Sequence, residues 1–588
     1  MKKLINDPHD VVAESLTGLV RLNPQLRLLE GSHTVVDASA AGRGAVAVLS
    51  GGGAGHEPAH AGFVGPGMLA GAVSGEVFTS PSVDDVLVGI RAVDSGAGVL
   101  LVVKNYTGDR LNFGLAAELA RADGIDVRMV VVSDDVALAG TAEHAGDRGI
   151  AGTVLVHKVA GAAAAAGRDL TEVARAAENA ANALRTMGVA LGPCTVPAAG
   201  TPSFHLDEDE VEWGLGIHGE QGVERSPAVT AAATVDRLLS SCLAAGELPS
   251  GQPVALLVNN LGGSSAMEIT LVADAALSWL RAHGVSVVRA WSGAFLTAME
   301  MEGVSLSVLA VDDDLVTLLD APVQTSAWPA LSGRVNDDPY LPAPAAESLA
   351  LEGAGLAGAS RSALERVLTA LQEAEPELTA MDQQVGDGDL GHSLDRGARA
   401  VLAEADRLPA RADLLLRRLS AIVRKSIGGT SGPLYAVLLL KASEELADVG
   451  NPTVTDWARA LVAGQRGIQE LGGAEPGDRT MLDALAPAAE ALGIAVDAPL
   501  SEALRRAAGA ARSGAEATAA MAPRRGRSSY AGERVKGHLD PGAWAVYRWM
   551  DALAQAMTSE ATETSETNDG VTSSARASGS TRNPAASD

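Results

Sequence analysis

The spacing of hydrophobic residues changes once along this chain, and that change limits the folds available to it. From Ala45 to about Val311, short β-rich runs alternate with alanine-rich stretches of helical period. From Ser360 to Met557 only the helical period recurs, in about eight amphipathic stretches separated by breaks that contain glycine or proline. Strands that alternate with helices are typical of α/β domains with largely parallel sheets. The sequence therefore predicts an α/β N-terminal domain followed by an all-α domain.

The same pattern places the candidate strands and the domain boundaries. Strands are expected at Ala45–Ser50, Gly98–Lys104, Val127–Ser133, Pro253–Asn260, Val285–Trp291 and Ser305–Val311. A chain of 588 residues is longer than one hydrophobic core usually organises. Residues 331–359 are rich in proline and glycine and are predicted to be a linker. The domains are therefore expected at 1–330 and 360–557, followed by a polar, disordered tail at 558–588.

The composition excludes several classes of function. With 45 basic and 73 acidic residues, the formal net charge of −28 repels DNA, RNA and anionic membrane surfaces. Only Cys194 and Cys242 occur, too few for a disulfide framework, so a reducing cytoplasm is expected. The N-terminus lacks the apolar core of a secretory signal, and no run approaches the ~18 apolar residues of a membrane span. We therefore expect a soluble cytoplasmic protein that binds neither nucleic acid nor membrane.

Polar residues follow two of the candidate strands. Gly51–His60 comes after the strand that begins at Ala45; its glycines would let backbone N–H groups approach a small ligand, and His56 adds a titratable group. Lys104–Asp109 comes at the end of the next candidate strand. Ligands of α/β sheets bind outside the carboxyl ends of the strands, so both segments are candidates for a crevice site. The alternatives are a glycine-rich turn with a surface histidine and a solvated loop.

The segment Trp213–Glu220 has the spacing GxGxxG of dinucleotide-binding folds. That fingerprint must open a helix, whereas Gln221–Pro227 is a poor helix start, so we reject this interpretation. A second match at Gly353–Gly358 lies in the predicted linker and follows no strand. What remains is His218 between glycines, a neutral imidazole able to attack a carbonyl or to form a hydrogen bond.

An acidic loop lies in the helical half. Asp382, Asp387 and Asp389 fall within eight residues around two glycines, and such a loop can fold its carboxylates around hard divalent cations. The EF-hand pattern fails, because its fifth and twelfth positions fall on Gly391 and Ala398. The alternative is an acidic turn without a metal.

Three further segments of the helical half could meet phosphate groups. Gly428–Pro433 and Gly477–Asp483 each precede an apolar helix, where they are either phosphate-binding helix starts or ordinary caps. Arg524, Arg525 and Arg527 could attract a triphosphate, or could form a solvated basic patch. The sequence has neither a Walker GxxxxGK[ST] motif nor the protein-kinase signatures, so a nucleotide site here would be built differently.

Between about Lys3 and Ala556, nine motifs occur in one order: GGGAGHEPAHAG, KNYTGD, GLGIHGE, NNLGG, VGDGD, GGTSG, GDRTM, GRSSY and DPG. In this order and spacing they resemble the single-chain ATP-dependent dihydroxyacetone kinase family, which includes erythrulose kinases. The resemblance implies an α/β substrate domain and an all-α nucleotide domain folded as an eight-helix barrel. Ala54, Gln221, Leu390 and His392 depart from the usual family residues.

The resemblance also implies roles for individual residues of the first domain. His218 would form a hemiaminal with the ketose carbonyl. His56 and Asp109 would serve as acid/base and hydroxyl-activating groups. Gly53 and Lys104 would complete the substrate pocket, which Asp109 and His218 also line.

In the second domain the resemblance implies that Asp382, Asp387 and Asp389 bind two Mg²⁺ ions that bridge the phosphates of ATP. The residues expected to contact the nucleotide are Asp389, Leu390, Gly391, His392, Thr430, Ser431, Gly472, Thr480, Met481, Arg527, Asp540, Pro541 and Gly542.

Together these observations predict a kinase that moves the γ-phosphoryl group of ATP, with Mg²⁺, onto the terminal hydroxyl of a short ketose, either dihydroxyacetone or D- or L-erythrulose. The expected binding partner is the small ketose substrate. The protein itself is expected to form a homodimer. Two alternatives are a carbonyl-sensing regulatory protein and a component of a phosphoenolpyruvate-linked phosphotransferase.

Overall fold

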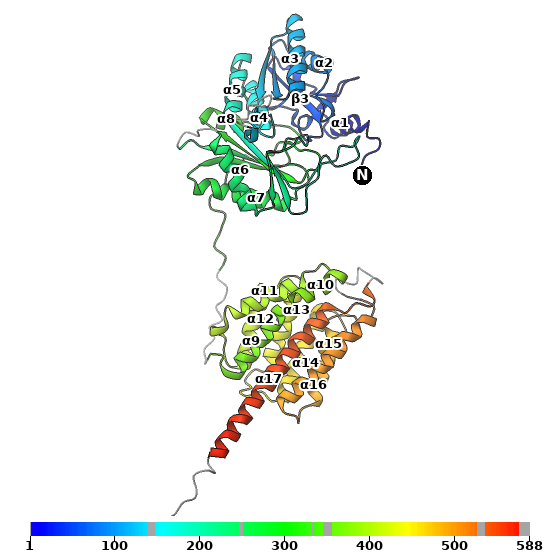
Figure 1. Cartoon of the computed structure of the whole chain (residues 1–588), viewed down its shortest axis with the longest axis vertical. Coiled ribbons are helices and arrows are strands. Elements are labelled where there is room, and N and C mark those ends of the chain that lie inside the picture. Colours follow the sequence, from blue (N-terminus) through cyan, green and yellow to red (C-terminus); the bar gives the residue numbers. More distant parts are fainter. Residues whose placement is uncertain are drawn as a thin grey trace, which may run out of the picture. The chain divides into compact units, whose positions relative to one another are not determined.

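The computed structural model describes residues 2–138, 147–245, 251–330, 333–344, 355–525 and 535–574. The chain forms two compact units, Met1–Pro342 and Ala343–Asp588, which are coloured blue to green and yellow-green to red in Figure 1. The division falls inside the segment that the sequence predicts as a linker. The predicted α/β and all-α classes of the two units are confirmed.

The first sheet of the N-terminal unit has six strands in the order β1-β2-β4-β3-β5-β6. The strands are β1 (Leu26–Leu28), β2 (Thr34–Asp37), β3 (Ala47–Ala54), β4 (Gly71–Val77), β5 (Val99–Lys104) and β6 (Val127–Val132). Strands β4, β3, β5 and β6 pair in parallel, whereas β1 and β2 form an antiparallel edge. Strands β3 and β5 are buried along their whole length, as expected where helices cover both faces.

The second sheet has six strands in the order β11-β10-β12-β7-β8-β9. The strands are β7 (Leu184–Ala190), β8 (Glu210–Trp213), β9 (Glu224–Pro227), β10 (Val254–Asn260), β11 (Val287–Gly293) and β12 (Gly303–Ala310). Only the β10–β11 pair of the described strands in this sheet is parallel, so the expectation of largely parallel sheets is wrong here. Strand β12 misled the prediction because it is buried at every residue, a pattern that is usual in parallel sheets.

Helices separate and cover the two sheets (Figure 1). Their bounds are α1 (Val11–Leu22), α2 (Val83–Val93), α3 (Thr107–Ala122), α4 (Thr153–Ala165), α5 (Leu170–Asn182), α6 (Ala231–Ala244), α7 (Ala266–Ala282) and α8 (Asp313–Asp320). Helices α2 and α3 pack on one face of the first sheet, and α6 and α7 on one face of the second. The largest core contains residues of both sheets and of α4, α5 and α8. Helix α4 is buried on nearly all sides because it lies in this core.

The glycines of Gly51–Ala54 belong to strand β3, which is longer than the predicted strand Ala45–Ser50. The alternative of a glycine-rich turn directly after that strand is therefore wrong for these residues. A Cβ atom at Gly51 would lie 2.2 Å from the carbonyl oxygen of Val73, and one at Gly52 would lie 2.3 Å from Lys104 Nζ. Glycine is therefore required here by the close approach of β4 and of a buried lysine.

The described part of the C-terminal unit contains α9 (Gly358–Glu373), α10 (Glu375–Val385), α11 (Leu390–Leu402), α12 (Ala412–Ser426), α13 (Ser431–Glu445), α14 (Val454–Gly472), α15 (Leu482–Ile494), α16 (Leu500–Ala517) and α17 (Pro541–Ser574). From α11 to α17 each helix packs against the next, and α9 packs against both α17 and α11. Eight described helices thus close into a ring, which agrees with the expected eight-helix barrel. Helix α10 packs against α11 outside this sequence of neighbours.

Helix α17 continues beyond Thr558, where the sequence predicts a disordered tail, and residues 575–588 lie outside the described ones. The tail therefore stays a prediction. Among the described helices, none combines the length and the apolar character needed to cross a lipid bilayer.

Candidate active site

His218 lies in the loop that joins β8 to β9, and its ring is oriented by Glu220. Its Nδ1 lies 2.8 Å from Glu220 Oε1, and its backbone N–H donates to Glu220 Oε2 at 3.0 Å. Burial alone would raise the pKa of Glu220, but the hydrogen bonds from His218 lower it to about 2. The ionised carboxylate accepts the Nδ1–H, so in the neutral tautomer of the ring the lone pair is on Nε2. In that tautomer, Nε2 is the ring nitrogen that can attack an electrophile.

Two aromatic rings and a second histidine surround His218. The rings of His56, Phe78 and Tyr106 have their centroids 4.9, 5.3 and 4.7 Å from that of His218. His56 Nδ1 lies 2.7 Å from the carbonyl oxygen of Thr297, so it donates, and Nε2 remains an unpaired buried acceptor. Burial, and next the charges of His218 and Lys104, hold the pKa of His56 well below its usual range. His56 is therefore a neutral base.

Lys104 and Asp109 form a buried ion pair at the carboxyl end of β5. Lys104 Nζ lies 3.9 Å from Asp109 Oδ2, and the two residues are 1% and 3% exposed. Burial lowers the pKa of Lys104, whereas the charge of Asp109 raises it. The hydroxyl of Ser80 donates to Asp109 Oδ1. A carboxylate held in this way can accept a proton from a hydroxyl group.

The predicted substrate residues come from three parts of the chain. Gly53 and His56 lie at the end of β3, Lys104 ends β5 with Asp109 in the first turn of the following α3, and His218 lies in the β8–β9 loop. A Cβ atom at Gly53 would lie 2.6 Å from the backbone nitrogen of Thr79, the residue after Phe78. Direct contacts link His56 with His218 and Lys104 with Asp109, and charge interactions link His56 with Lys104.

Sequence reasoning missed four residues of this site. Glu220 and Tyr106 stand inside the motifs GLGIHGE and KNYTGD, so the motifs themselves could have pointed to them. Phe78 and Ser80 follow β4 and carry no local signal, because only the pairing of β4 beside β3 brings them near His56 and Asp109.

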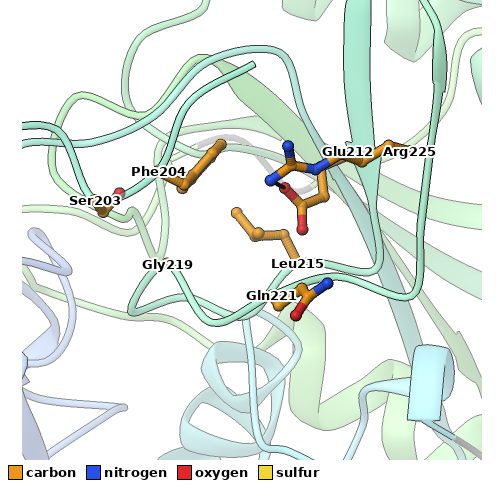
Figure 2. Close-up of a pocket in the computed structure, with 7 residues that line it drawn as sticks. All are labelled: Ser203, Phe204, Glu212, Leu215, Gly219, Gln221 and Arg225. Carbon is orange, nitrogen blue, oxygen red and sulfur yellow. Dashed lines mark ion pairs between the residues drawn. The ribbon is translucent and has the colours of Figure 1, made fainter.

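A pocket of about 600 Å³ lies beside the same loop (Figure 2). It is lined by Ser203, Phe204, Glu212, Leu215, Gly219, Gln221 and Arg225. None of these is a predicted site residue, but Gly219 follows His218 directly. Arg225 Nη2 lies 3.0 Å from the buried Glu212, so the two charges in this pocket neutralise each other.

The three predicted metal ligands gather in the C-terminal unit. Asp382 lies in α10, Asp387 in the following loop, and Asp389 directly before α11. One oxygen of each carboxylate lies within 4.8 Å of the others. Asp382 Oδ2 also accepts the backbone N–H of Leu390 at 3.2 Å. Three converging carboxylate oxygens fit the preference of Mg²⁺ for hard oxygen ligands.

Other predicted nucleotide loops lie near this cluster. Thr430 precedes α13 and Ser431 opens it, and a Cβ atom at the neighbouring Gly429 would lie 3.6 Å from Asp389 Oδ2. A Cβ atom at Gly542 would lie 3.7 Å from Met481 Cβ. Asp540 interacts electrostatically with Asp382, although burial is the main cause that raises its pKa to about 6. Thr480 and Met481 directly precede α15, and Pro541 and Gly542 open α17.

The remaining residues predicted to contact the nucleotide are Leu390, Gly391, His392, Gly472 and Arg527. The side chain of Leu390 is buried among helices, and Gly391 packs so tightly on α10 that a Cβ atom would lie 2.3 Å from the carbonyl oxygen of Glu375. His392 is exposed, with Nδ1 2.7 Å from Glu375 Oε1. Gly472 ends α14 beside Leu434. Arg527 lies outside the described residues.

Both units of the chain match known domain families. The Dak1 domain family matches residues 17–327, and the DAK2 domain family matches residues 384–555. Triokinase/FMN cyclase of Rattus norvegicus is 44% identical, over 84% of this chain and 87% of that protein. L-erythrulose 1-kinase of Mycolicibacterium smegmatis is 39% identical, over 95% of this chain and all of that protein.

Among solved structures, the dihydroxyacetone kinase of C. freundii in complex with AMP-PNP and Mg²⁺ is similar to this chain. The TM-score is 0.62 and the identity 36%, over 94% of this chain and 99% of that one. With both domain families in one chain and relatives matched over nearly their whole length, this protein belongs to the dihydroxyacetone kinase family.

Proposed function

We propose that the protein is an ATP-dependent kinase that phosphorylates the terminal hydroxyl of a three- or four-carbon ketose. The observation that carries the proposal is the pair His218–Glu220, which leaves an imidazole nitrogen with a free lone pair beside the neutral base His56. Family membership and kinase relatives support the same class of reaction.

The ketose is anchored covalently at His218. The Nε2 lone pair attacks the carbonyl carbon, and the π electrons of the C=O bond move to its oxygen. Overall the ring loses its Nδ1 proton, on the side of Glu220, and the carbonyl oxygen gains one proton, so the hemiaminal is neutral. The anchored substrate then holds its terminal hydroxyl in one place, which removes most of the orientational cost of the transfer.

Asp109 accepts the proton of that hydroxyl as the oxygen attacks the γ-phosphorus. Lys104 and Ser80 hold the carboxylate in position through the ion pair and the hydrogen bond described above. The P–O bond to ADP breaks as the new P–O bond forms, so the products are the sugar phosphate and ADP.

ATP is bound by the C-terminal unit. Asp382, Asp387 and Asp389 would hold Mg²⁺, which supplies neutralisation of phosphate charge when it is bound. Thr430 and Ser431 at the start of α13 offer backbone N–H groups, which suit phosphate oxygens.

A short ketose fits this chemistry because the hemiaminal needs a free carbonyl. A 2-ketose of three or four carbons cannot close a five-membered ring, so dihydroxyacetone and D- or L-erythrulose stay open. The second candidate function, a carbonyl sensor without turnover, would use His218 but would have no need of the carboxylate cluster.

An assay of ADP release, with dihydroxyacetone, D- and L-erythrulose, glyceraldehyde and glycerol as acceptors, separates these functions. Turnover with one or more ketoses, and little with glycerol, supports the kinase. ATP consumption that never depends on a ketose would refute it and favour the sensor.

We also propose a homodimer in the cytoplasm. Cys194 and Cys242 are buried free thiols, which suits a reducing compartment. Helix α3 exposes Leu111, Leu115 and Leu119, spaced to share one face, which suits contact with a second copy. Light scattering after size exclusion tests the dimer, and a mass of one chain would refute it.

A further inference from the structure

A buried polar cluster lies behind the ketose residues, and apart from Lys104 its members have no role in the reaction described above. It consists of Ser50, His60, Lys104 and His157, which are 0%, 4%, 1% and 0% exposed. Of these, only Lys104 belongs to the proposed substrate site. Burying a polar group costs free energy unless its hydrogen bonds are satisfied. The donors and acceptors around each member of the cluster therefore indicate its protonation.

The protonation of His60 follows from its contact with Lys104. Lys104 Nζ lies 3.1 Å from His60 Nε2. An ammonium group can only donate, so His60 Nε2 accepts, and the neutral ring carries its proton on Nδ1. Burial, and next the charge of Lys104, hold the pKa of His60 well below its usual range, which keeps the ring neutral.

The protonation of His157 follows in the same way from Ser50. The Ser50 hydroxyl donates its single hydrogen to the carbonyl oxygen of Val102 at 2.7 Å. His157 Nε2, 3.0 Å from Ser50 Oγ, must therefore donate, and Nδ1 of His157 keeps a lone pair. Burial, and next the charge of Lys104, lower the pKa of His157 to about 3, so this ring is neutral too.

The two histidines are therefore complementary. His60 Nδ1 is a donor and His157 Nδ1 is an acceptor; both atoms are buried without a partner, and the rings meet edge-on with centroids 5.1 Å apart. A hydrogen bond from His60 Nδ1–H to His157 Nδ1 would satisfy both atoms. With that bond, donation would run in one direction, from the Lys104 ammonium through His60 and His157 to Ser50.

This series determines where the ammonium can lie. Lys104 Nζ lies between His60 and Gly52. A Cβ atom at Gly52 would be only 2.3 Å from Nζ. On its other side Nζ faces Asp109 Oδ2 at 3.9 Å. An ammonium group has three N–H bonds; His60 accepts one, so two remain for Asp109 and a ketose.

We propose that His60 and His157 are positioning residues for the ketose site, because they hold the Lys104 ammonium against Asp109 through a buried series of hydrogen bonds that ends at Ser50. The inference rests on the proposed function, since Lys104 and Asp109 act on a ketose only if one binds there. Neither histidine touches the reacting atoms.

The first test compares His60→Leu with His60→Gln in the full-length protein. Leucine removes the acceptor of a charged hydrogen bond, so kcat/KM for the ketose should fall about 10- to 100-fold. Glutamine places an amide oxygen near the position of Nε2 and should restore kcat/KM to within about threefold of the wild type. The KM for ATP should not change, because the proposed ATP residues belong to the other unit.

Val156→Ala is the matched control, because Val156 is a fully buried neighbour of His157 on α4 without a polar group. It should lower the melting temperature but leave ketose kcat/KM within about threefold. The proposal fails if His60→Leu keeps the wild-type kcat/KM, or if His60→Gln loses as much as His60→Leu, since a packing role alone would then suffice.

The second test does not depend on turnover. In long-range ¹H–¹⁵N spectra of the wild-type protein labelled at histidine, His60 should be protonated at Nδ1 and His157 at Nε2. The signals are assigned by their loss in His60→Gln and His157→Gln. The opposite tautomer at either ring would overturn the proposed series. If the protein phosphorylates no ketose but shows these tautomers, the proposed function fails and the hydrogen-bond series stands.

Discussion

Replacing Glu220 tests the central feature of the proposed mechanism, the orientation of His218. Glu220→Ala removes the acceptor of His218 Nδ1–H and also that of the His218 backbone N–H. The ring can then adopt the other tautomer, in which Nε2 carries the proton and has no lone pair to attack a carbonyl. We therefore expect slower turnover of ketoses without any effect on the binding of ATP.

The size of the effect follows from the contacts. The difference between the ordinary pKa of 4.5 and about 2 for Glu220 corresponds to roughly 3.4 kcal/mol. The side chain is 37% exposed, so solvent screens the contact and we reduce the figure to about 2 kcal/mol. That loss lowers ketose kcat/KM about 30-fold. Glu220→Gln keeps an acceptor but loses the charge, and we expect about a fivefold loss.

The assay is coupled ADP release, with the ketose and ATP varied in turn. Glu224→Gln is a matched control, because Glu224 is an exposed carboxylate of β9 whose partner is Arg237, 2.6 Å away. It should keep wild-type kinetics. A wild-type ketose kcat/KM in Glu220→Ala would show that the carboxylate does not orient the catalytic ring. If the KM for ATP rose by the same factor as ketose kcat/KM fell, the substitution would have damaged the protein in general.

Three further outcomes are expected. Asp387→Ala or Asp389→Ala should lower Mg-ATP turnover at least about 100-fold, while gentle native mass spectrometry still shows the ketose adduct; unchanged turnover would refute the metal assignment. His218→Ala should abolish that adduct and reduce the preference for dihydroxyacetone over glycerol, and an adduct of unchanged mass would place the covalent bond elsewhere. Because Glu220 has a lower pKa in the folded protein, the stability it contributes is complete above pH 4.5 and disappears as the pH falls through about 2. Urea unfolding of the wild type and Glu220→Gln should therefore converge over that range, and a constant difference would contradict the pKa.

Local features of the sequence predicted the helical half best. The 3.6-residue period marks each helix independently of its neighbours, and Asp382, Asp387 and Asp389 lie so close in the chain that any compact loop brings them together. The sheets were harder. Strand β12 has the continuous apolar run of a buried strand, but its direction depends on its neighbours β10 and β7, which the run itself does not specify. The glycines of β3 similarly signalled a close approach, without showing that β4 and Lys104 were the groups approaching.

What the sequence by itself determined was the class of each half and the identity of the polar segments at the ends of strands and helices, because periodicity and turn chemistry are properties of neighbouring residues. The family motifs added the roles expected of His218, His56 and Asp109. Only the tertiary structure decided that Phe78 and Ser80 reach the site from the end of β4, and that His60 and His157 lie behind Lys104. These contacts join residues that the order of strands in the sheet brings together, and that order is set by the packing of the whole unit.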